Sequence, residues 1–334
     1  MNGSFRTLAI TGVPGWFTQA LLDDLRIAPL ENYRVRALVH PSIDVSAILA
    51  RNPELAGVEP YDLLAGNGSA LKAVDVLVHA AAVIHVRRTS EWYRLNTEGT
   101  KILAQKAREA GVRRFVFLSS NAAGGRCESP TQVLTEADPP QPLSHYGRSK
   151  LLAEEALMRL HEPGRFEVTI LRPSMFYGPP VPARHVDVYR RILHGRMPMV
   201  GNGNYRRSIT YIDNLVQAAR LAVIHPAAPG ETFYVVDEPI YTTGSITDAM
   251  AAALGARLRF LRLPEWTGPV AYRVDRALAS AGIYWQNLHL VGEAHWHVAI
   301  SCRKLQERLG YSPAITLKEG MRRSVEWCRR EGKI

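Results

Sequence analysis

The chain has 334 residues, of which 46% are hydrophobic and 22% are charged. This composition excludes disordered and fibrous proteins, and the length allows one large α/β unit or two modest domains. The formal net charge is +10, but the basic residues are scattered, without a Lys/Arg block or interleaved aromatic residues. We therefore expect no nucleic-acid partner, and a positive field that attracts a phosphorylated ligand fits the charge at least as well.

No apolar run approaches the roughly 20 residues that span a membrane. Residues 1–6 lead directly into a short strand, without the apolar stretch and cleavage site of a signal peptide. We therefore expect a cytoplasmic protein with no membrane partner. The three cysteines share no close spacing that would suggest a disulfide framework. The histidines near Cys302 match no zinc-binding spacing, so no metal is expected; they are His289, His295 and His297.

Short apolar runs alternate with helical patterns through the first half of the chain. Strands are expected at residues 7–11, 34–39, 74–79, 114–119 and 167–171, and helices near 15–26, near 91–110 and from residue 146. Such alternation predicts a parallel sheet with helices on both faces. The strands are almost wholly apolar, which is typical of a sheet that is covered on both faces.

The first strand runs into a glycine turn and then into a helix. Gly12 permits the tight turn, and Gly15 lets the backbone approach a pyrophosphate that rests on the helix N-terminus. Trp16 and Phe17, the next two residues, are expected beside this ligand. The third small position of the pattern is Thr18, so the helix and strand should lie slightly further apart. A turn of this kind, after the first strand and before a helix, is typical of dinucleotide-binding proteins.

The rhythm of strands and helices breaks after residue 173. Residues 178–182 indicate a loop, 201–203 a tight turn, 233–236 a strand that returns to the sheet, and 317–329 a terminal helix. We predict a Rossmann-type, doubly wound α/β fold with a smaller, discontinuous α/β carboxy-terminal lobe. Residues 1–173, with the returning strand, would form the NAD(P)-binding domain, and residues 174–334 would mainly form the substrate-binding lobe.

The end of the second strand bears on the choice of cofactor. Dinucleotide folds usually place an acid there to hold the adenosine ribose. In this chain the strand ends at Val39 and His40, with no acid before Asp44. His40 suits contact with a 2′-phosphate, and equally a solvent-facing loop. We expect NAD as the cofactor, with NADP as the alternative.

Tyr146 and Lys150 lie four residues apart at the head of a helical pattern, so they share one face of a helix. A free tyrosine hydroxyl has a pKa near ~10, too high for a base at neutral pH. An ammonium group held nearby favours the phenolate and lowers that pKa. This pairing suits an enzyme that moves a proton on or off an alcohol while a hydride moves on the neighbouring carbon.

Together these features resemble the extended short-chain dehydrogenase/reductase family, within the NAD-dependent epimerase/dehydratase group, in its nucleotide-sugar epimerase and 4-ketoreductase branch. The resemblance runs from residue 7 to about residue 313. It rests on motifs in a fixed order: Thr11-Gly12-x-x-Gly15, Tyr61-Asp62-Leu63, His79-Ala80-Ala81-Ala82, Asn96-Thr97-Glu98-Gly99-Thr100, Leu118-Ser119-Ser120, Tyr146-x-x-x-Lys150, Leu171-Arg172-Pro173 with Tyr177-Gly178-Pro179, Arg206-Arg207-Ser208 and Leu309-Gly310-Tyr311-Ser312-Pro313.

The resemblance implies a role for each matching residue. In the cofactor site, Asp62 and Leu63 would line the adenine pocket, Ala80 and Ala81 would pack along the nicotinamide ribose, and Lys150 would bind that ribose. Asn96 would brace the active site, and Pro173 would flank the nicotinamide. In the substrate site, Ser120 would hold the reacting oxygen, and Arg207 would meet the substrate diphosphate, which a guanidinium fork suits well. Three neighbours of these motifs are expected beside the substrate: His85, Asn121 and Ser174.

Two departures from the family pattern narrow the expected chemistry. The dehydratase branch carries an Asp-Glu pair after the serine motif, whereas this chain has Asn121-Ala122-Ala123, so 4,6-dehydration is not expected. Gly124-Gly125 replaces the usual Tyr-Gly and leaves the identity of the sugar open.

These inferences lead to an enzyme that acts at C4 of a nucleotide-linked sugar, with a UDP-sugar favoured and Ser120, Tyr146 and Lys150 as catalytic residues. We expect a 4-epimerase, in which the hydride returns to the keto intermediate. The alternatives are an NAD(P)H-dependent 4-ketoreductase, a reductase of steroid-like or flavonoid-like ketones, and a non-catalytic dinucleotide sensor. Family analogy further implies a homodimer.

Overall fold

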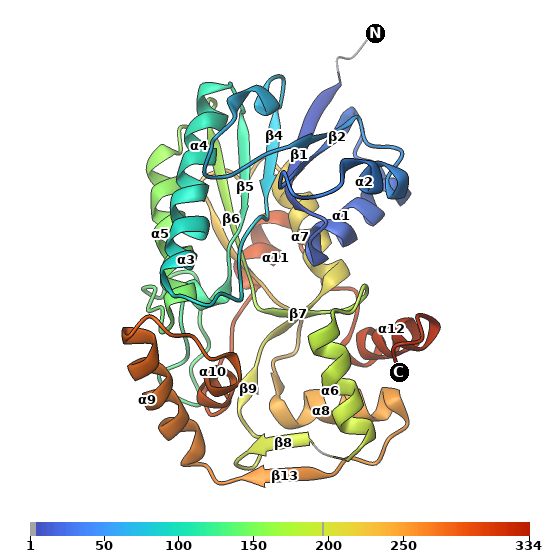
Figure 1. Cartoon of the computed structure of the whole chain (residues 1–334), viewed down its shortest axis with the longest axis vertical. Helices are drawn as coiled ribbons and strands as arrows, with labels where there is room; N and C mark the ends of the chain where they lie inside the picture. Colours follow the sequence, from blue (N-terminus) through green and yellow to red (C-terminus); the bar gives the residue numbers. More distant parts are fainter. Residues whose placement is uncertain (1–4, 196) are drawn as a thin grey trace.

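The computed structural model describes residues 5–195 and 197–334, and its centre is a seven-stranded parallel sheet (Figure 1). The strand order is β11-β6-β5-β4-β1-β2-β3, and every neighbouring pair is parallel. The strands span Arg6–Val13 (β1), Tyr33–Val39 (β2), Gly57–Pro60 (β3), Val76–His79 (β4), Arg114–Leu118 (β5), Glu167–Pro173 (β6) and Thr232–Val235 (β11). The predicted doubly wound α/β fold is thereby confirmed, including the strand that returns near residue 233.

Helices cover both faces of this sheet. They span Trp16–Ile27 (α1), Val45–Arg51 (α2), Ser90–Trp92 (α3), Thr100–Glu109 (α4), His145–Leu160 (α5) and Ile212–Ile224 (α7). Side chains alternate across β1: Leu8 and Ile10 belong to the core under α1 and α7, whereas Ala9 belongs to the core under α4 and α5. Each face of the sheet thus has its own apolar core, as the nearly continuous apolar strands predict.

The helix predicted near residues 91–110 is interrupted at its start. Tyr93–Gly99 forms a π-helical segment between α3 and α4. Such segments are rare and are often found at functional sites. Here the segment carries Asn96, whose amide bonds to the backbone of Val83 with both its oxygen, at 2.9 Å, and its nitrogen, at 3.0 Å.

The carboxy-terminal lobe lies below the sheet in Figure 1. Its helices span Ala183–Leu193 (α6), Thr243–Leu254 (α8), Thr267–Ser280 (α9), Gln286–Glu293 (α10) and Leu317–Arg330 (α12), and Arg303–Leu309 (α11) packs beside β11 and α7. Three two-stranded sheets pair β7 (Met175–Tyr177) with β10 (Ile209–Tyr211), β9 (Arg206–Arg207) with β12 (Tyr241–Thr242), and β8 (Met197–Val200) with β13 (Phe260–Leu263). None of these short strands was predicted, because two to four residues are too few to show a periodic pattern.

Within the described residues, no helix combines the length and the apolar character needed to cross a membrane. No group of three or more His, Cys, Asp or Glu side chains in residues 5–195 and 197–334 is placed to hold a metal ion. The three cysteines are buried and free.

Candidate active site

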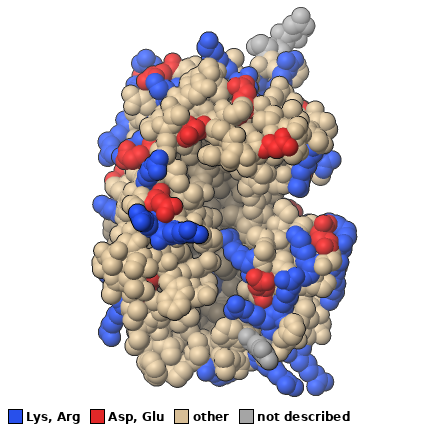
Figure 2. All heavy atoms as spheres, in the orientation of Figure 1, with Lys and Arg blue, Asp and Glu red and all other residues tan. Residues whose placement is uncertain are grey.

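A cleft of about 640 Å³ opens at the carboxyl ends of β1, β4 and β5, between the sheet and the lobe. The strand order reverses at β1, and ligands of open α/β sheets bind beyond the carboxyl ends of the strands at such a point. The hollow is visible between the upper and lower halves of the surface in Figure 2. Phe176, Pro182 and Arg184 close it from the side of the lobe.

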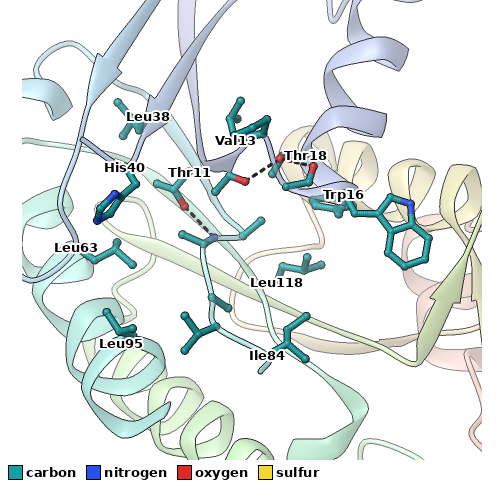
Figure 3. Close-up of a pocket in the computed structure, with 18 of the residues that line it drawn as sticks. Thr11, Val13, Trp16, Thr18, Leu38, His40, Leu63, Ile84, Leu95 and Leu118 are labelled. Atoms are coloured by element: carbon teal, nitrogen blue, oxygen red, sulfur yellow. Dashed lines mark hydrogen bonds between the residues drawn. The ribbon is translucent and has the colours of Figure 1, made fainter. Parts of the chain in front are cut away.

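The glycine turn forms one wall of the cleft (Figure 3). Gly12 has a φ of 86°, and a Cβ atom there would lie 2.7 Å from the backbone nitrogen of Ala81. A Cβ atom on Gly15 would lie 2.6 Å from the carbonyl oxygen of Gly12. Thr18 is buried, and its hydroxyl donates to the carbonyl oxygens of Gly12 and Gly15, both at 3.0 Å. Only glycine fits at the first two positions, and the open backbone edge suits a pyrophosphate on the N-terminus of α1.

A buried relay of side chains supports the floor of the cleft. The Thr11 hydroxyl lies 2.7 Å from Nδ1 of His79, and Nε2 of His79 lies 2.9 Å from the Thr100 hydroxyl. Because Thr100 donates onward to the carbonyl of Asn96, it accepts from Nε2–H, so Nδ1 accepts from Thr11. Burial lowers the pKa of His79 to about 3 and keeps the ring neutral. Thr11 also accepts from the Ala81 backbone nitrogen at 3.3 Å, which holds the wall at residues 80–82 (Figure 3).

Ser120 and Tyr146 meet beside the cleft. Ser120 follows β5, its Oγ accepts from the backbone nitrogen of Ala122 at 3.2 Å, and it lies close enough to the Tyr146 hydroxyl to favour the phenolate. Burial raises the pKa of Tyr146 above its ordinary value, and the Ser120 hydroxyl and the charge of Arg184 oppose this rise. The depressed pKa expected from the Tyr–Lys spacing is therefore not found, because the loss of water outweighs the nearby positive charge.

Lys150 lines the same cleft but points toward the sheet. Its ammonium donates to the carbonyl oxygen of Leu118 at 2.7 Å and lies 4.2 Å from the centre of the Phe117 ring. Burial lowers the pKa of Lys150 to about 7, while the carboxylate of Glu154, one turn further along α5, acts in the opposite direction. The sequence assigned the lowering of the Tyr146 pKa to Lys150, whereas the cation that acts on Tyr146 in this geometry is Arg184.

Arg184 and His85 face each other at the mouth of the cleft. Nη1 of Arg184 lies 3.0 Å from Nε2 of His85, and the guanidinium lies 5.8 Å from the centre of the Trp16 ring. Within the described residues, Arg184 forms no ion pair with a carboxylate. A cation in this position can meet a negative charge on a ligand.

Most residues predicted for the cofactor line the cleft: Gly12, Gly15, Trp16, Phe17, His40, Leu63, Ala80, Ala81, Tyr146 and Lys150. Three do not appear among its lining residues. Asp62 caps a turn, with Oδ1 accepting from the Leu64 backbone nitrogen at 2.8 Å. Asn96 is buried behind the wall, as a bracing role requires, and Pro173 is buried within β6.

The residues predicted for the substrate are spread over two places. His85 lies at the cleft mouth, and Asn121 begins a short 3-10 helix beside Ser120. Ser174 is buried, and its hydroxyl donates to the backbone carbonyl of Ser208. This bond connects the start of β7 to the residue between β9 and β10. Arg207 lines a second cavity of about 210 Å³ in the lobe.

The strand β7 separates the two cavities. Phe176 faces the cleft, while Met175 and Tyr177 face the second cavity, as the two-residue period of a strand requires. In the second cavity, Arg207 is half-buried and donates to the backbone carbonyl of Glu293 at 2.8 Å. No carboxylate of the described residues forms an ion pair with it, and burial lowers its pKa. An arginine that has lost water without forming an ion pair is suited to an anionic ligand.

Comparison with known proteins places this geometry in a family. The model of the NAD dependent epimerase/dehydratase family matches residues 8–236. The chain belongs to this family. It is thus an enzyme of the extended short-chain dehydrogenase/reductase type, in a family whose cofactor is NAD.

Individual relatives are similar to this chain over almost its whole length. The uncharacterised protein y4nL of Sinorhizobium fredii is 35% identical, and the alignment covers 97% of this chain and 95% of that protein. UDP-glucose 4-epimerase of Vibrio cholerae is 27% identical over 96% of this chain and 95% of its own length. The solved UDP-glucuronic acid 4-epimerase of Bacillus cereus, in complex with UDP-glucuronic acid and NAD, has a TM-score of 0.76 with 20% identity, covering 97% and 99% of the two chains. This last likeness concerns the fold.

Two functional features of this family member were not predicted. Arg184 was not predicted because it belongs to α6, a helix without a clear start in the sequence pattern. Its position just after the proline-rich loop was the available signal. The role of His79 was also missed. A histidine at the end of an apolar strand is a signal for a buried, neutral ring, but its two threonine partners are far away in sequence.

Proposed function

We propose that the enzyme is an NAD-dependent nucleotide-sugar 4-epimerase. The observation that carries this proposal is the meeting of Ser120 and Tyr146 at the edge of a glycine-walled cleft. The close approaches at Gly12 and Gly15 fit a dinucleotide, with its pyrophosphate against the turn and its nicotinamide toward Tyr146 and Lys150. When bound, NAD would supply a carrier that accepts a hydride from C4 and returns it.

The side chains of the chain would handle the proton. Tyr146 takes the proton of the 4-hydroxyl group as the hydride leaves C4, and it returns that proton to the alkoxide formed on the other face of the sugar. Ser120 holds the reacting oxygen through both half-reactions. Lys150 would bind the nicotinamide ribose, and the positive charge of Arg184 would favour the phenolate.

The second cavity would hold the nucleotide end of the substrate. Arg207 offers donor groups to the diphosphate, and no carboxylate of the described residues forms an ion pair with it. Phe176 of β7 lines the cleft, whereas Met175 and Tyr177 line this cavity, so the two cavities lie on opposite sides of one strand. A UDP-sugar is the substrate class we favour, since UDP-sugars occur in the names of both epimerases compared above.

Two rival reactions use the same fold. A 4-ketoreductase would employ Ser120, Tyr146 and Lys150 with the tyrosine as proton donor. A 4,6-dehydratase needs an acid and a base near C5 and C6, and the residues after Ser120 are Asn121, Ala122 and Ala123. None of the described residues that line the cleft is acidic.

The experiment that tests the proposal starts from purified enzyme without added cofactor. An epimerase retains NAD, which heat denaturation releases, and interconverts a UDP-hexose with its C4 epimer. A ketoreductase instead consumes added NADH in a one-to-one ratio with a 4-keto sugar. Failure of every UDP-, dTDP- and GDP-sugar tested, both as a substrate and as a thermal stabiliser, contradicts a nucleotide-sugar enzyme.

One observation favours a second candidate, a reductase of apolar ketones. Apart from Arg207, the second cavity is lined mainly by apolar side chains, including Met175, Met197, Met250 and Met321. Methionines adapt to irregular apolar ligands. Stabilisation by a steroid-like ketone, without stabilisation by any nucleotide, would identify this candidate.

A further inference from the structure

The helical hairpin of α9 and α10 carries an apolar surface away from the active site. On α9 and beside its ends, the exposed residues Trp266, Val270, Val274, Ala277 and Ala281 follow one another at intervals of three or four residues. At 3.6 residues per turn they fall within roughly 80° of the helix surface. We call these five residues the α9 stripe. Trp266 is 64% exposed, and Val270 and Val274 are 44% and 45% exposed.

The opposite side of α9 is fixed to α10, so the stripe is presented on a defined surface. Gly292 of α10 packs directly on Tyr272 of α9. The His289 ring joins the two helices, with Nδ1 at 2.7 Å from Asp275 and Nε2 at 3.2 Å from Glu293. These two carboxylates raise the pKa of His289 to about 9 and keep the bridge charged at neutral pH. The exposed face is thus the one turned away from α10.

Further apolar side chains are exposed along the same hairpin. Ile283 and Trp285, in and after the loop between the helices, are 50% and 58% exposed, and Leu290 on α10 is 55% exposed. On the side shown in Figure 2, the lower left of the molecule, over α9 and α10, is largely free of charged side chains. Exposed apolar residues gathered in one place mark an interaction surface, whereas single exposed residues do not.

The charges around the hairpin have one predominant sign. Residues 257–293 contain five arginines and three acids, Glu265, Asp275 and Glu293. Asp275 and Glu293 both pair with His289, which leaves Glu265 as the exposed acid without such a partner. Arg273 and Arg276 flank the stripe on one side, and in the described part of the chain neither forms an ion pair. An apolar stripe with tryptophan and flanking arginine is the pattern of a helix that lies in the interface of an anionic bilayer.

We propose that the α9 stripe docks the enzyme on the surface of a membrane that contains anionic lipids. Val270 and Val274 would enter the boundary between headgroups and acyl chains, Trp266 would sit at the headgroup level, and the arginines would meet lipid phosphates. This mode of binding needs no spanning helix, so the absence of a long apolar run in the sequence does not bear on it.

The active-site cleft is connected to this hairpin. Tyr284, between α9 and α10, packs on Trp92 with ring centres 4.8 Å apart, and Trp92 packs on Tyr146 at 6.3 Å. Two aromatic contacts therefore connect the proposed docking hairpin to the catalytic tyrosine. The proposal does not depend on the sugar or on the direction of hydride transfer.

A second copy of this chain fits the stripe less well than a bilayer does. A two-fold interface places the same patch on both partners. Arg273 and Arg276 of one copy would then lie close to those of the other, and the surroundings offer one exposed carboxylate, Glu265, to compensate them. Anionic lipids would compensate both of these arginines without bringing further arginines close to them.

Vesicle sedimentation tests the proposal with the full-length enzyme. We expect the enzyme to sediment with phosphatidylcholine–phosphatidylglycerol vesicles at about 0.1 M salt and to stay in solution with phosphatidylcholine alone. The variant V270S/V274S should lose about tenfold or more in vesicle affinity, because it removes the inserted apolar groups. The matched control is I27S/I224S, which changes two exposed isoleucines on α1 and α7, and it should bind like the wild type.

Two further measurements sharpen the assignment. R273Q/R276Q should weaken binding by roughly tenfold, with the remaining binding less dependent on salt. Tryptophan emission should shift to the blue with anionic vesicles and lose this shift in W266F/W285F. Melting temperatures of all variants near that of the wild type show that the changes act on binding and not on folding.

Three results would overturn the proposal. The wild-type enzyme could remain in solution with anionic vesicles. V270S/V274S and I27S/I224S could bind alike, which would assign binding to charge alone. Sedimentation equilibrium could show a wild-type dimer that V270S/V274S converts to a monomer, without vesicle binding, which would assign the stripe to a second copy of the chain.

Discussion

The sheet half and the lobe treat their buried charges differently. In the sheet half, Glu154 and Arg172 form a buried ion pair with Nη2–Oε2 at 2.6 Å, and Ser119 donates to the same carboxylate. In the lobe, Arg184 and Arg207 form no ion pair with any described carboxylate. A closed network fixes the framework that carries the catalytic residues. Arginines without an ion pair can exchange water for the anionic groups of a ligand. The sheet half thus holds the catalytic residues rigidly, and the lobe recognises the ligand.

The largest expected effect tests the catalytic assignment in the sheet half. Y146F removes only the hydroxyl group, so turnover should fall by about 10²–10⁴-fold while NAD content stays close to that of the wild type. The matched control is Y93F, because the Tyr93 hydroxyl bonds to His145 at 2.7 Å and lies outside the cleft lining. Initial rates with a UDP-sugar measure both. A Y146F enzyme within tenfold of the wild type contradicts the assignment.

The next effect concerns the rigid wall of the cleft. G12A adds a Cβ atom 2.7 Å from the Ala81 nitrogen at a φ of 86°, so NAD affinity should fall by about tenfold or more. G111A is the matched control, since Gly111 has a φ of 84° with no atom within 4 Å of its added Cβ. The control should lose about 1 kcal/mol of stability and no NAD affinity. Calorimetric titration measures the NAD affinity of both variants. Equal losses of affinity would contradict the claim that the turn at Gly12 binds NAD.

In the lobe, R207A tests whether Arg207 binds the substrate diphosphate. It should raise KM for a nucleotide sugar by about tenfold or more and leave kcat within a few-fold, since a charge-assisted hydrogen bond contributes about 1.5–3 kcal/mol. R207K keeps the charge without the fork and should fall between the two enzymes. Steady-state kinetics over a range of substrate concentrations separates KM from kcat. An unchanged KM would contradict the claim that the substrate diphosphate binds Arg207 in this cavity.

The smallest effect is a pH-dependent gain in stability. The buried ammonium of Lys150 has a pKa lowered to about 7, whereas the unfolded chain keeps the ordinary value near 10.5. The cost of burying the charge is therefore complete below pH 7 and fades as the pH rises toward 10.5. K150M should melt roughly 2–4 °C above the wild type at pH 6, and this difference should shrink by pH 9. A difference that is constant with pH would contradict the lowered pKa.

The same contrast explains what could be predicted from the sequence. The long apolar strands of the sheet, the glycine turn at Gly12 and the Tyr146–Lys150 spacing are local patterns, and each has a counterpart in the structure. The pairing of Ser120 with Tyr146 required the family resemblance, because the two lie on different elements. The sense of the Tyr146 pKa shift was wrong, since burial is decided by the surrounding fold and not by the four-residue spacing.

The lobe could not be predicted to the same extent. Its strands have two to four residues, and β9 finds its partner β12 more than thirty residues further along the chain. Arg207 was predicted from the motif that surrounds it, but its separate cavity depends on β7, which was not predicted. The α9 stripe was readable as a helical pattern once the helix limits were known. Its exposure depends on which side of α9 meets α10.

The most direct test of the central claim follows the hydrogen at C4 of the substrate. A UDP-hexose with deuterium at C4 should be converted to its epimer with the label retained at C4, in ordinary water and without added NAD, because the hydride leaves and returns within one cleft. Loss of the label to solvent, or its appearance in released NADH beside a 4-keto product, would contradict the account.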